Sequence, residues 1–154
     1  MKERKYETML AQLEGLTAGE TNQMSVLANV SALMRDTMGE RYFWVGFYLV
    51  EGDQLVLGPF QGSVACYRIG RGRGVCGTAW VQARTQVVPD VEQFAGHIAC
   101  SSLSRSEIVV PLIDGGGTVR GVLDIDSTEL AQFDDTDAHY LEQAARIIAG
   151  ALWP

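Results

Sequence analysis

Positive charge is scarce in this sequence, and so are long apolar runs. The chain has 154 residues, with 12 lysines and arginines against 19 aspartates and glutamates, and its formal net charge is −7. A nucleic-acid partner needs a basic face that meets the phosphates, so the charge argues against one. No apolar run approaches the roughly 20 residues of a membrane span. The first residues, Met1–Lys5, lead into polar residues and not into the apolar core of a signal peptide. We therefore expect a cytoplasmic protein with no membrane partner.

Cysteines are also few, and their number is odd. The three are Cys66, Cys76 and Cys100, and in a reducing compartment a purely structural disulfide is rare. The sequence has no CxxC pair, and His97 three residues before Cys100 is by itself a weak zinc signal. A metal site made of the three cysteines and His97 is therefore the weakest hypothesis. We expect no bound metal and no bound cofactor.

Length and composition predict one domain that spans residues 1–154. The chain is 47% hydrophobic and 20% charged, which is typical of a globular protein with one sizeable core. Apolar residues at helical spacing predict N-terminal helices within about residues 3–38 and a C-terminal helix over about 136–152. Asn22 is the expected N-cap of the second helix and Gly39 its stop, while Gly15 interrupts the first.

Alternating apolar residues and turn signals predict a sheet of about six strands between residues 42 and 127. The predicted strands cover residues 42–50, 54–57, 65–69, 86–89, 107–112 and 118–126. Turns at residues 51–53 and 114–117 make two hairpins, and the Gly58-Pro59 pair ends the second strand. The pattern predicts an α+β domain, in which a mostly antiparallel sheet carries helices on one face.

The glycine-rich segment 70–77 resembles a phosphate-binding loop only superficially. It matches neither GxxxxGK[ST] nor a GxGxxG fingerprint after a strand. We interpret it as a tight turn that leads into a short helix over residues 76–82.

Cys100 lies in a loop of small and polar residues, directly before the buried strand that begins at Glu107. A cysteine at such a junction, close to a chargeable partner, can act as a nucleophile, whereas burial in an apolar run raises the pKa of the thiol and makes it inert. The alternative is that Cys100 is only a small apolar side chain.

Strand alternation places two aromatic side chains on one face of the first strand. Phe43, Val45, Phe47 and Leu49 are assigned to the core. Trp44 and Tyr48 face the other way, and Gly46 between them leaves a notch that a small ligand can enter. Ordinary packing of the two aromatics is the alternative.

Two carboxylates share a face of the last strand. Asp124 and Asp126 alternate with apolar residues and lie beside Glu107 on the paired strand. Their repulsion costs stability unless a cation, a proton or a ligand ammonium relieves it. A solvated acidic face is the alternative.

Six sequence blocks follow one another in a specific order. They are Trp44–Leu49, Leu57–Gly62, Gly72–Ala79, Gly96–Cys100, Ser104–Pro111 and Gly121–Ser127. With cysteines spaced ten and twenty-four residues apart, they resemble the GAF-domain free methionine-(R)-sulfoxide reductases over nearly the whole chain. The sequence departs from that family at Ser101–Leu103, where an acidic residue often follows the cysteine, and in the lengthened turn at Gly115–Gly117.

The resemblance implies a single GAF-type domain that reduces free L-methionine-(R)-S-oxide to L-methionine. In that chemistry Cys100 attacks the sulfoxide sulfur as a thiolate and becomes a sulfenic acid when methionine leaves. Cys66, by analogy, condenses with it to a disulfide that thioredoxin reduces. Cys76 substitutes for Cys66 or relays.

The resemblance also implies roles for the other site residues. A carboxyl group kept neutral by its neighbours protonates the sulfoxide oxygen, and Glu107 is the expected donor. Asp124 and Asp126 receive the substrate ammonium. Backbone N–H groups near Ala99 and Cys100 hold its carboxylate.

Trp44 and Tyr48 then enclose the methyl sulfoxide end of the substrate. The competing hypothesis is a non-catalytic GAF module that senses a cyclic nucleotide or a tetrapyrrole, because fold alone does not separate the two. A signalling GAF module is normally joined to an output domain, for which this chain has no room. The sequence is also compatible with a homodimer.

Overall fold

The computed structural model describes residues 1–98 and 100–154. Within these residues four α-helices, two short 3-10 helices and six strands follow one another along the chain. In chain order they are α1 (Lys2–Thr17), α2 (Gln23–Met38), η1 (Gly39–Arg41), β1 (Trp44–Glu51), β2 (Gln54–Gln61), β3 (Arg68–Gly70), α3 (Gly74–Gln82), β4 (Gln86–Val88), η2 (Val91–Gln93), β5 (Ser106–Ile113), β6 (Val119–Ser127) and α4 (Asp135–Leu152).

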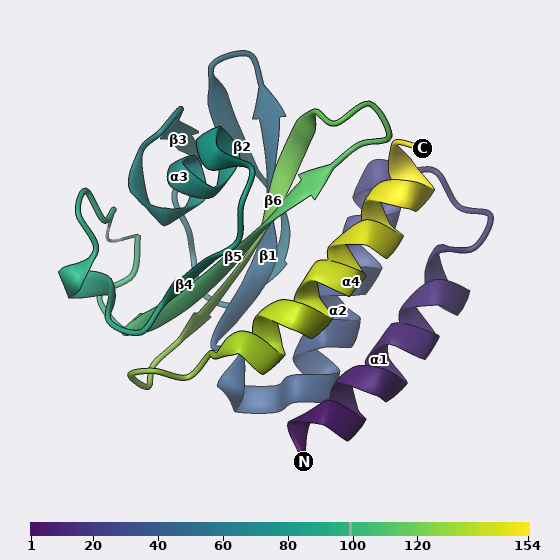
Figure 1. Ribbon diagram of the computed structural model, residues 1–154, viewed down its shortest axis with the longest axis horizontal. Helices are drawn as coiled ribbons and strands as arrows, with labels where there is room; N and C mark the ends of the chain where they lie inside the picture. The colour runs from purple at the N-terminus through teal and green to yellow at the C-terminus, as the bar shows by residue number, and fades with distance from the viewer. Residues whose placement is uncertain (99) are drawn as a thin grey trace.

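The strands form one antiparallel sheet in the order β3-β2-β1-β6-β5-β4. The hairpins β1–β2 and β5–β6 form as the sequence predicts. They join where β6 pairs with β1, so β6 lies between β1 and β5 at the centre of the sheet (Figure 1). Because β1 and β6 are neighbours, residues that are far apart in the sequence lie side by side at the centre of the sheet.

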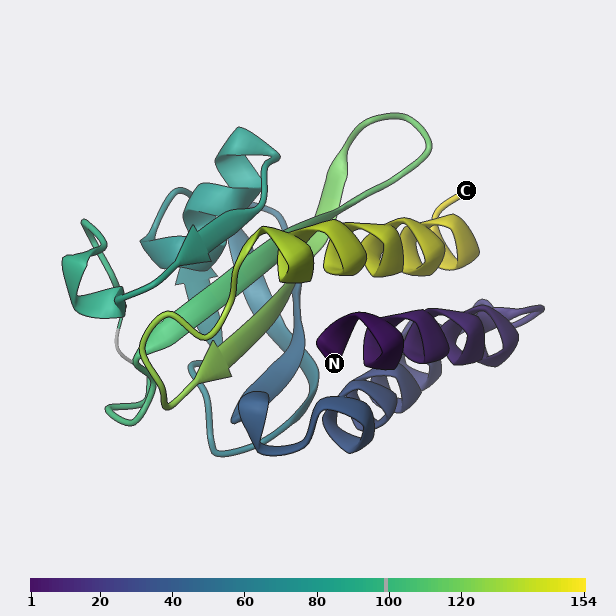
Figure 2. The ribbon, with the colours of Figure 1, turned by 60° about the horizontal axis from the view of Figure 1, so that its bottom comes forward.

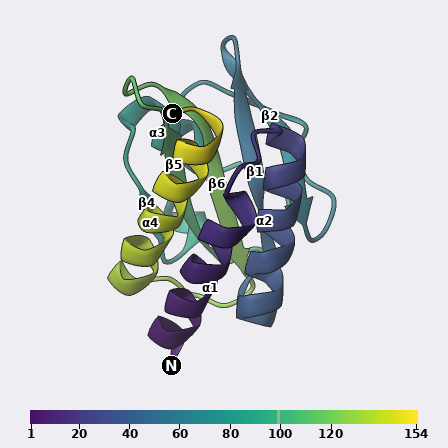
Figure 3. The same ribbon diagram turned by 90° about the vertical axis from the view of Figure 1, so that its right-hand side faces the viewer.

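The three long helices cover one face of the sheet (Figures 1 and 3). Helices α2 and α4 pack on the strands, and α1 packs against both of them. Alternate side chains of the central strands, including Val45, Phe47 and Leu123, point into this helical layer and form the larger apolar core. The predicted helical face is therefore confirmed for the long helices. No helix in the described part of the chain has both the length and the apolar character needed to cross a membrane.

The short helix α3 lies on the opposite face of the sheet, away from α4 and α1 (Figure 2). Its Val75, Ala79 and Trp80 pack with Tyr48 and Val109 from the strands in a second apolar cluster. The prediction placed helices on one face only. Periodicity cannot assign α3 to a face, because nearly all of this helix is apolar and it lacks a polar stripe.

Helix α2 has the caps that the sequence predicts, whereas α1 does not end at its glycine. The Asn22 side chain accepts a hydrogen bond from the N–H of Ser25, and Gly39 ends α2 with φ 63°. Helix α1 continues through Gly15 to Thr17. A glycine inside a helix costs only about 1 kcal/mol relative to alanine, and burial of the apolar face of α1 offsets that cost.

Strand β2 continues past the Gly58-Pro59 pair, where the sequence predicts its end. Tyr48 pairs with Leu57, and Gly46 pairs with Phe60, so two residues of β2 stand opposite one residue of β1. This is a β-bulge, and a proline is tolerated there because its missing N–H falls outside the regular ladder.

A buried polar cluster joins the starts of α1 and α4. Asp137, fully buried, accepts hydrogen bonds from the Tyr6 hydroxyl at 2.6 Å and from the Lys2 ammonium at 2.9 Å. The Tyr6 hydroxyl also lies 2.8 Å from that of Tyr42. Asp137 and Asp134 form a capping box at the start of α4. The Asp137 carboxylate therefore links α4 to α1 and, through the Tyr6 hydroxyl, to Tyr42 after η1.

Candidate functional site

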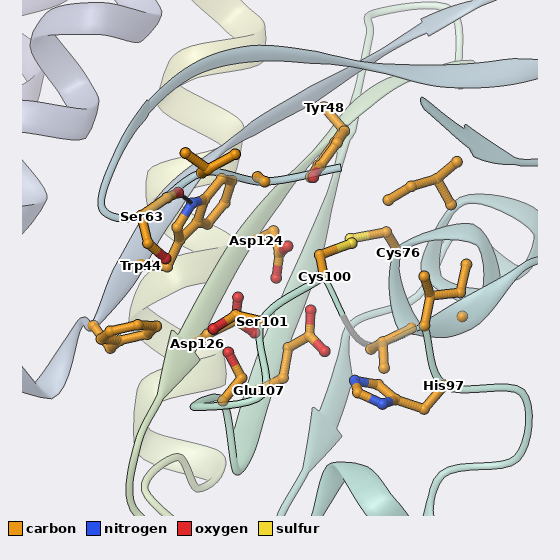
Figure 4. Close-up of a pocket in the computed structure, with 18 of the residues that line it drawn as sticks. Trp44, Tyr48, Ser63, Cys76, His97, Cys100, Ser101, Glu107, Asp124 and Asp126 are labelled. Carbon is orange, nitrogen blue, oxygen red and sulfur yellow. Dashed lines mark hydrogen bonds between the residues drawn. The ribbon is translucent and has the colours of Figure 1, made fainter. Parts of the chain in front are cut away.

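Three carboxyl side chains converge on the face of the sheet that carries α3. Glu107 pairs across the ladder with Asp126, and Asp124 lies two residues before Asp126 on β6. Directly opposed residues have Cβ atoms about 4.5–5.5 Å apart, and residues two apart on a strand share a face. Figure 4 shows the three carboxyl groups turned toward the same space as Cys100. The shared face that the sequence predicts is therefore present.

Glu107 and Asp124 are each only 6% exposed, so the alternative of a solvated acidic face does not hold for them. Burial raises the pKa of Glu107 well above its usual value, and the charges of Asp124 and Asp126 raise it further. Burial also raises the pKa of Asp126, with a further contribution from Asp124. A raised pKa in adjacent carboxyl groups means that the cluster retains protons at a pH where isolated carboxyl groups are ionised.

Asp124 is held by hydrogen bonds on one side and left open on the other. Burial raises its pKa, and hydrogen bonds with Glu107 and Cys76 oppose that rise. Its Oδ1 atom is buried and has no hydrogen-bond partner. A buried polar atom without a partner is costly, and this one lies in the wall of a cavity. The atom is therefore placed to accept a hydrogen bond from a bound group.

Trp44 and Tyr48 of β1 form one wall of the cavity. The Trp44 ring stacks on Tyr48 at 6.0 Å and on Phe60 at 5.1 Å between ring centres. The Trp44 Nε1–H donates to the Ser63 carbonyl at 3.0 Å. The notch that the sequence suggests at Gly46 is filled, because a Cβ there would lie 2.3 Å from the Phe60 Cβ and 2.9 Å from the Trp44 ring. The cavity lies instead between the Trp44 and Tyr48 rings and the carboxyl groups.

Phe43 faces the cavity and not the helical core to which it was assigned. It precedes the first residue of β1, Trp44. Strand alternation therefore does not determine its direction. Val45 and Phe47 do face the helical core as predicted, and Leu49 packs against it.

Cys66 and Cys100 form a disulfide, with a Cα–Cα distance of 5.5 Å. Both residues are half-buried, and Cys100 lines the cavity. The bond joins the loop before β3 to the loop before β5. Cys66 was predicted within a strand over residues 65–69, but β3 begins at Arg68, because the Cys66 carbonyl accepts from the Tyr48 hydroxyl instead of a strand partner.

Cys76 is a free thiol buried at the start of α3. Burial raises its pKa well above the usual range, and the charges of Asp124, Glu107 and Asp126 add to that effect. The group is therefore a neutral thiol near pH 7, and a neutral thiol is a poor nucleophile.

The cavity enclosed by these groups has a volume of about 50 Å³, room for only a few water molecules. Its lining includes residues that the sequence interpretation missed: Ser63, Arg73, His97, Ile98, Ser101 and Ser104. Arg73 supplies positive charge, and burial lowers the pKa of His97. These residues come from three loops, and no periodic pattern in the sequence indicates that they meet.

A family model for the GAF domain matches residues 22–152. A GAF domain-containing protein A from Dictyostelium discoideum is 56% identical over 96% of this chain and 92% of its own length. A free methionine-R-sulfoxide reductase from Escherichia coli is 49% identical over 90% of this chain and 82% of its own. The structure of a free methionine-R-sulfoxide reductase from Neisseria meningitidis in complex with its substrate superposes with a TM-score of 0.94, at 53% identity, over 98% of this chain and 90% of that one.

The chain belongs to the GAF-domain family of free methionine-R-sulfoxide reductases. The family predicted from the sequence blocks is thereby confirmed.

Among the described residues, the structure brings together the site residues that the resemblance to the free methionine-R-sulfoxide reductases implies. Trp44, Tyr48, Cys76, Cys100, Glu107, Asp124 and Asp126 all line one cavity, and Cys66 is bonded to Cys100. Ala99 lies outside the described residues.

A metal site made of all three cysteines and His97 does not match this arrangement, because the sulfur atoms of Cys66 and Cys100 are bonded to each other. Among the described residues, a different group, Cys76, Glu107 and Asp124, has ligand atoms within 4.8 Å of one another. The same three groups are the ones whose hydrogen bonds and charges shift one another's pKa in the carboxyl cluster.

Proposed function

We propose that the chain reduces free L-methionine-(R)-S-oxide to L-methionine, with Cys100 as the nucleophile and thioredoxin as the external reductant. The observation that supports this most directly is the Cys66–Cys100 disulfide at a cavity walled by buried carboxyl groups. A redox-active sulfur and a stored proton are the two things that sulfoxide reduction needs.

In the first step the Cys100 thiolate attacks the sulfoxide sulfur while a carboxyl group gives a proton to the sulfoxide oxygen. The attack forms a sulfur–sulfur bond, and the protonated oxygen leaves the substrate sulfur as water. Water then attacks Cys100 Sγ, the sulfur–sulfur bond breaks, methionine leaves with its electron pair, and Cys100 is left as a sulfenic acid. Cys66 then attacks the sulfenic sulfur, water leaves, and the Cys66–Cys100 disulfide forms. Two electrons have moved from the two thiols to the substrate.

Glu107 is our choice for the proton donor. It is buried, and burial together with two neighbouring carboxylates raises its pKa well above the ordinary range, which keeps the acid form available near neutral pH. Asp124, with its unpaired Oδ1, and Asp126 then receive the substrate ammonium. An ammonium beside these carboxylates replaces the missing hydrogen-bond partner and reduces their mutual repulsion.

Arg73 adds a candidate for the substrate carboxylate, alongside the backbone N–H groups near Cys100 that the resemblance suggested. A guanidinium binds a carboxylate through two parallel hydrogen bonds. A site with partners for both the ammonium and the carboxylate selects free methionine sulfoxide, because a residue within a polypeptide has neither charge.

The disulfide form cannot react with this substrate, since the Cys100 sulfur is already bonded to Cys66. Both ends of the disulfide lie in loops. We therefore propose that the substrate reacts only after the disulfide has been reduced and the two loops have separated. The cycle then requires an external dithiol, and we place it in the cytoplasm, where thioredoxin keeps thiols reduced.

A non-catalytic sensing role is the weaker candidate. The GAF domain of a phosphoenolpyruvate-protein phosphotransferase from Coxiella burnetii, at 16% identity, shares the fold with a TM-score of 0.85. The fold is therefore common to proteins with other functions. A redox disulfide at a pocket of buried carboxyl groups suits catalysis better than reversible ligand binding.

The experiment that tests the proposed function is the loss of free methionine sulfoxide in the presence of dithiothreitol. We expect loss of the (R) epimer, with the (S) epimer and N-acetylmethionine sulfoxide left intact, because only one epimer directs its oxygen to the carboxyl groups while its sulfur faces Cys100. Absence of turnover with the (R) epimer contradicts the proposal. Equal rates on the N-acetylated compound contradict the account of the ammonium site.

A further inference from the structure

Exposed apolar side chains gather around the Cys66–Cys100 disulfide. Val64 is 87% exposed, Tyr67 is 79% exposed and Leu103 is 60% exposed. Apolar side chains exposed together are typical of surfaces that meet a partner, whereas single ones need no explanation. Here three of them flank the one bond that a reductant has to reach.

Chain geometry places these side chains close to the disulfide. Val64 and Tyr67 are two residues and one residue from Cys66, and Leu103 is three residues from Cys100. Consecutive Cα atoms are about 3.8 Å apart, so each of the three lies within roughly 11 Å of a bonded cysteine. The two cysteines are themselves 5.5 Å apart between Cα atoms. A single protein face of ordinary size covers this area.

The loop that carries Val64 and Tyr67 is fixed to the sheet by its backbone. The Cys66 carbonyl accepts from the Tyr48 hydroxyl at 3.0 Å, and the Tyr67 carbonyl accepts from the Leu57 N–H at 2.9 Å. The Val64 and Tyr67 side chains of this loop remain in solvent. The surface is therefore preorganised, which lowers the entropic cost of binding a partner.

The two segments that carry the disulfide differ in charge from the whole chain, while the carboxyl groups of Glu107 and Asp124 beside Cys100 are buried. Segments 62–76 and 95–106 contain no aspartate or glutamate, although the chain carries a net charge of −7. They contain four arginines, all exposed: Arg68, Arg71, Arg73 and Arg105. Exposed positive charge in the segments that carry the apolar residues favours a partner with acidic residues beside its own apolar contact.

We propose that Val64, Tyr67 and Leu103 form the docking surface for a thioredoxin-class dithiol protein that reduces the Cys66–Cys100 disulfide. The proposal rests on the proposed function, which requires an external dithiol. It adds where that protein binds and which sulfur it attacks. The attacked sulfur is that of Cys66, because Val64 and Tyr67 flank it on both sides, whereas Cys100 opens into the cavity.

The exchange proceeds in two balanced steps. The partner thiolate attacks Cys66 Sγ, a mixed disulfide forms, and Cys100 leaves as the thiolate. The second thiol of the partner then attacks the mixed disulfide and releases Cys66. The partner ends as a disulfide, having given two electrons, and its two protons balance the two thiols formed. Cys100 is thus freed first, at the cavity where substrate binds.

The test compares two reductants on one double variant, Tyr67→Ser with Leu103→Ser. Val64 is left unchanged because it also lines the cavity. We expect kcat/KM for thioredoxin to fall about tenfold, as for truncated anchors at an interface, and turnover with dithiothreitol to stay at the wild-type rate. The matched control is Leu16→Ser with Met24→Ser, two exposed apolar residues on α1 and α2. This control should leave both reductants unaffected.

Mapping the mixed disulfide tests the attacked sulfur without any sulfoxide. Oxidised protein is mixed with a thioredoxin whose second cysteine is serine, and iodoacetamide blocks the thiol that is released. We expect a peptide that contains Cys66 joined to thioredoxin and an alkylated Cys100. A cross-link at Cys100 contradicts the proposal, and so does trapping of the double variant as fast as the wild type.

Other outcomes separate the hypotheses. Wild-type protein that reduces no sulfoxide even with dithiothreitol contradicts the proposed function, whereas unchanged thioredoxin kinetics in the double variant contradict only the docking surface. Reduction by glutathione alone, with thioredoxin inactive, also contradicts it. A dimer in wild-type sedimentation that is lost in the double variant shows that a second copy of the chain covers this surface, and overturns the assignment to a reductase.

Discussion

Replacement of Glu107 by glutamine separates proton donation from packing at the site. The amide has nearly the same shape as the carboxyl group and fills the same buried position between Asp124 and Asp126, but it cannot act as an acid. Loss of a general acid typically lowers turnover by about 10²–10⁴, which corresponds to about 2.7–5.5 kcal/mol of barrier at about 1.36 kcal/mol per tenfold. We expect kcat to fall within that range, with a smaller change in KM.

The assay is steady-state reduction of free (R)-sulfoxide with dithiothreitol, so that the docking of a reductase does not limit the rate. Asp124→Asn and Asp126→Asn are the matched variants. As ammonium ligands they should mainly raise KM. Wild-type kcat in Glu107→Gln refutes the reasoning, and so does an equal loss of kcat in all three variants, because the roles would then not divide as proposed.

The stability of the same variant has a defined pH dependence. The folded-state pKa of Glu107 is raised above its unfolded value of about 4.3. The folded protein therefore holds a proton that the unfolded chain has lost, and stability falls as pH rises between the two values, by up to about 1.4 kcal/mol per pH unit. Glutamine removes this titration. Urea unfolding from about pH 5 to 8 should show a flatter profile for Glu107→Gln than for the wild type, and a steeper one contradicts the direction of the shift.

Three further changes test other parts of the structure. Cys66→Ser should release one methionine per chain and then stall as a sulfenic acid, detected with a dimedone probe; continued cycling with thioredoxin would assign the resolving role elsewhere. Gly46→Ala should lower the free energy of unfolding by about 1–3 kcal/mol, because the new Cβ would lie 2.8 Å from the Phe60 Cα; unchanged stability in urea would show that the strands separate easily. Asp137→Asn should cost about 1–3 kcal/mol, because the amide nitrogen in place of Oδ2 cannot accept from Lys2 or from the Asp134 N–H, and wild-type activity per folded molecule would confirm that the effect is confined to the helical layer.

Local patterns were sufficient for the features that depend on one strand or one helix. The shared face of Asp124 and Asp126 follows from the two-residue period of a strand, and the Asn22 cap of α2 follows from its own side chain. The position of Asp124 and Asp126 beside Glu107 also follows from the sequence, because a short turn joins β5 to β6 and fixes how the two strands pair.

Features that depend on contacts between distant segments were not predictable in this way. The notch at Gly46 is filled by residues of another strand, and the bulge at Gly58 keeps β2 paired beyond a proline. Arg73 and His97 join the cavity from separate loops. None of these follows from a periodic pattern, since the first two are set by the pairing of β1 with β2 and the others by the packing of loops around the cavity.

Single-turnover chemistry of Cys100→Ser tests the central claim most directly. Reduced wild-type protein, mixed with a limiting amount of free (R)-sulfoxide and no reductant, should form methionine at up to one equivalent per chain as the Cys66–Cys100 disulfide appears. The serine variant should form none, because Cys66 lies outside the cavity lining and Cys76 is a buried thiol with a raised pKa. Methionine formation by the Cys100→Ser variant at the wild-type rate would show that another group attacks the sulfoxide, and would contradict the mechanism proposed for this site.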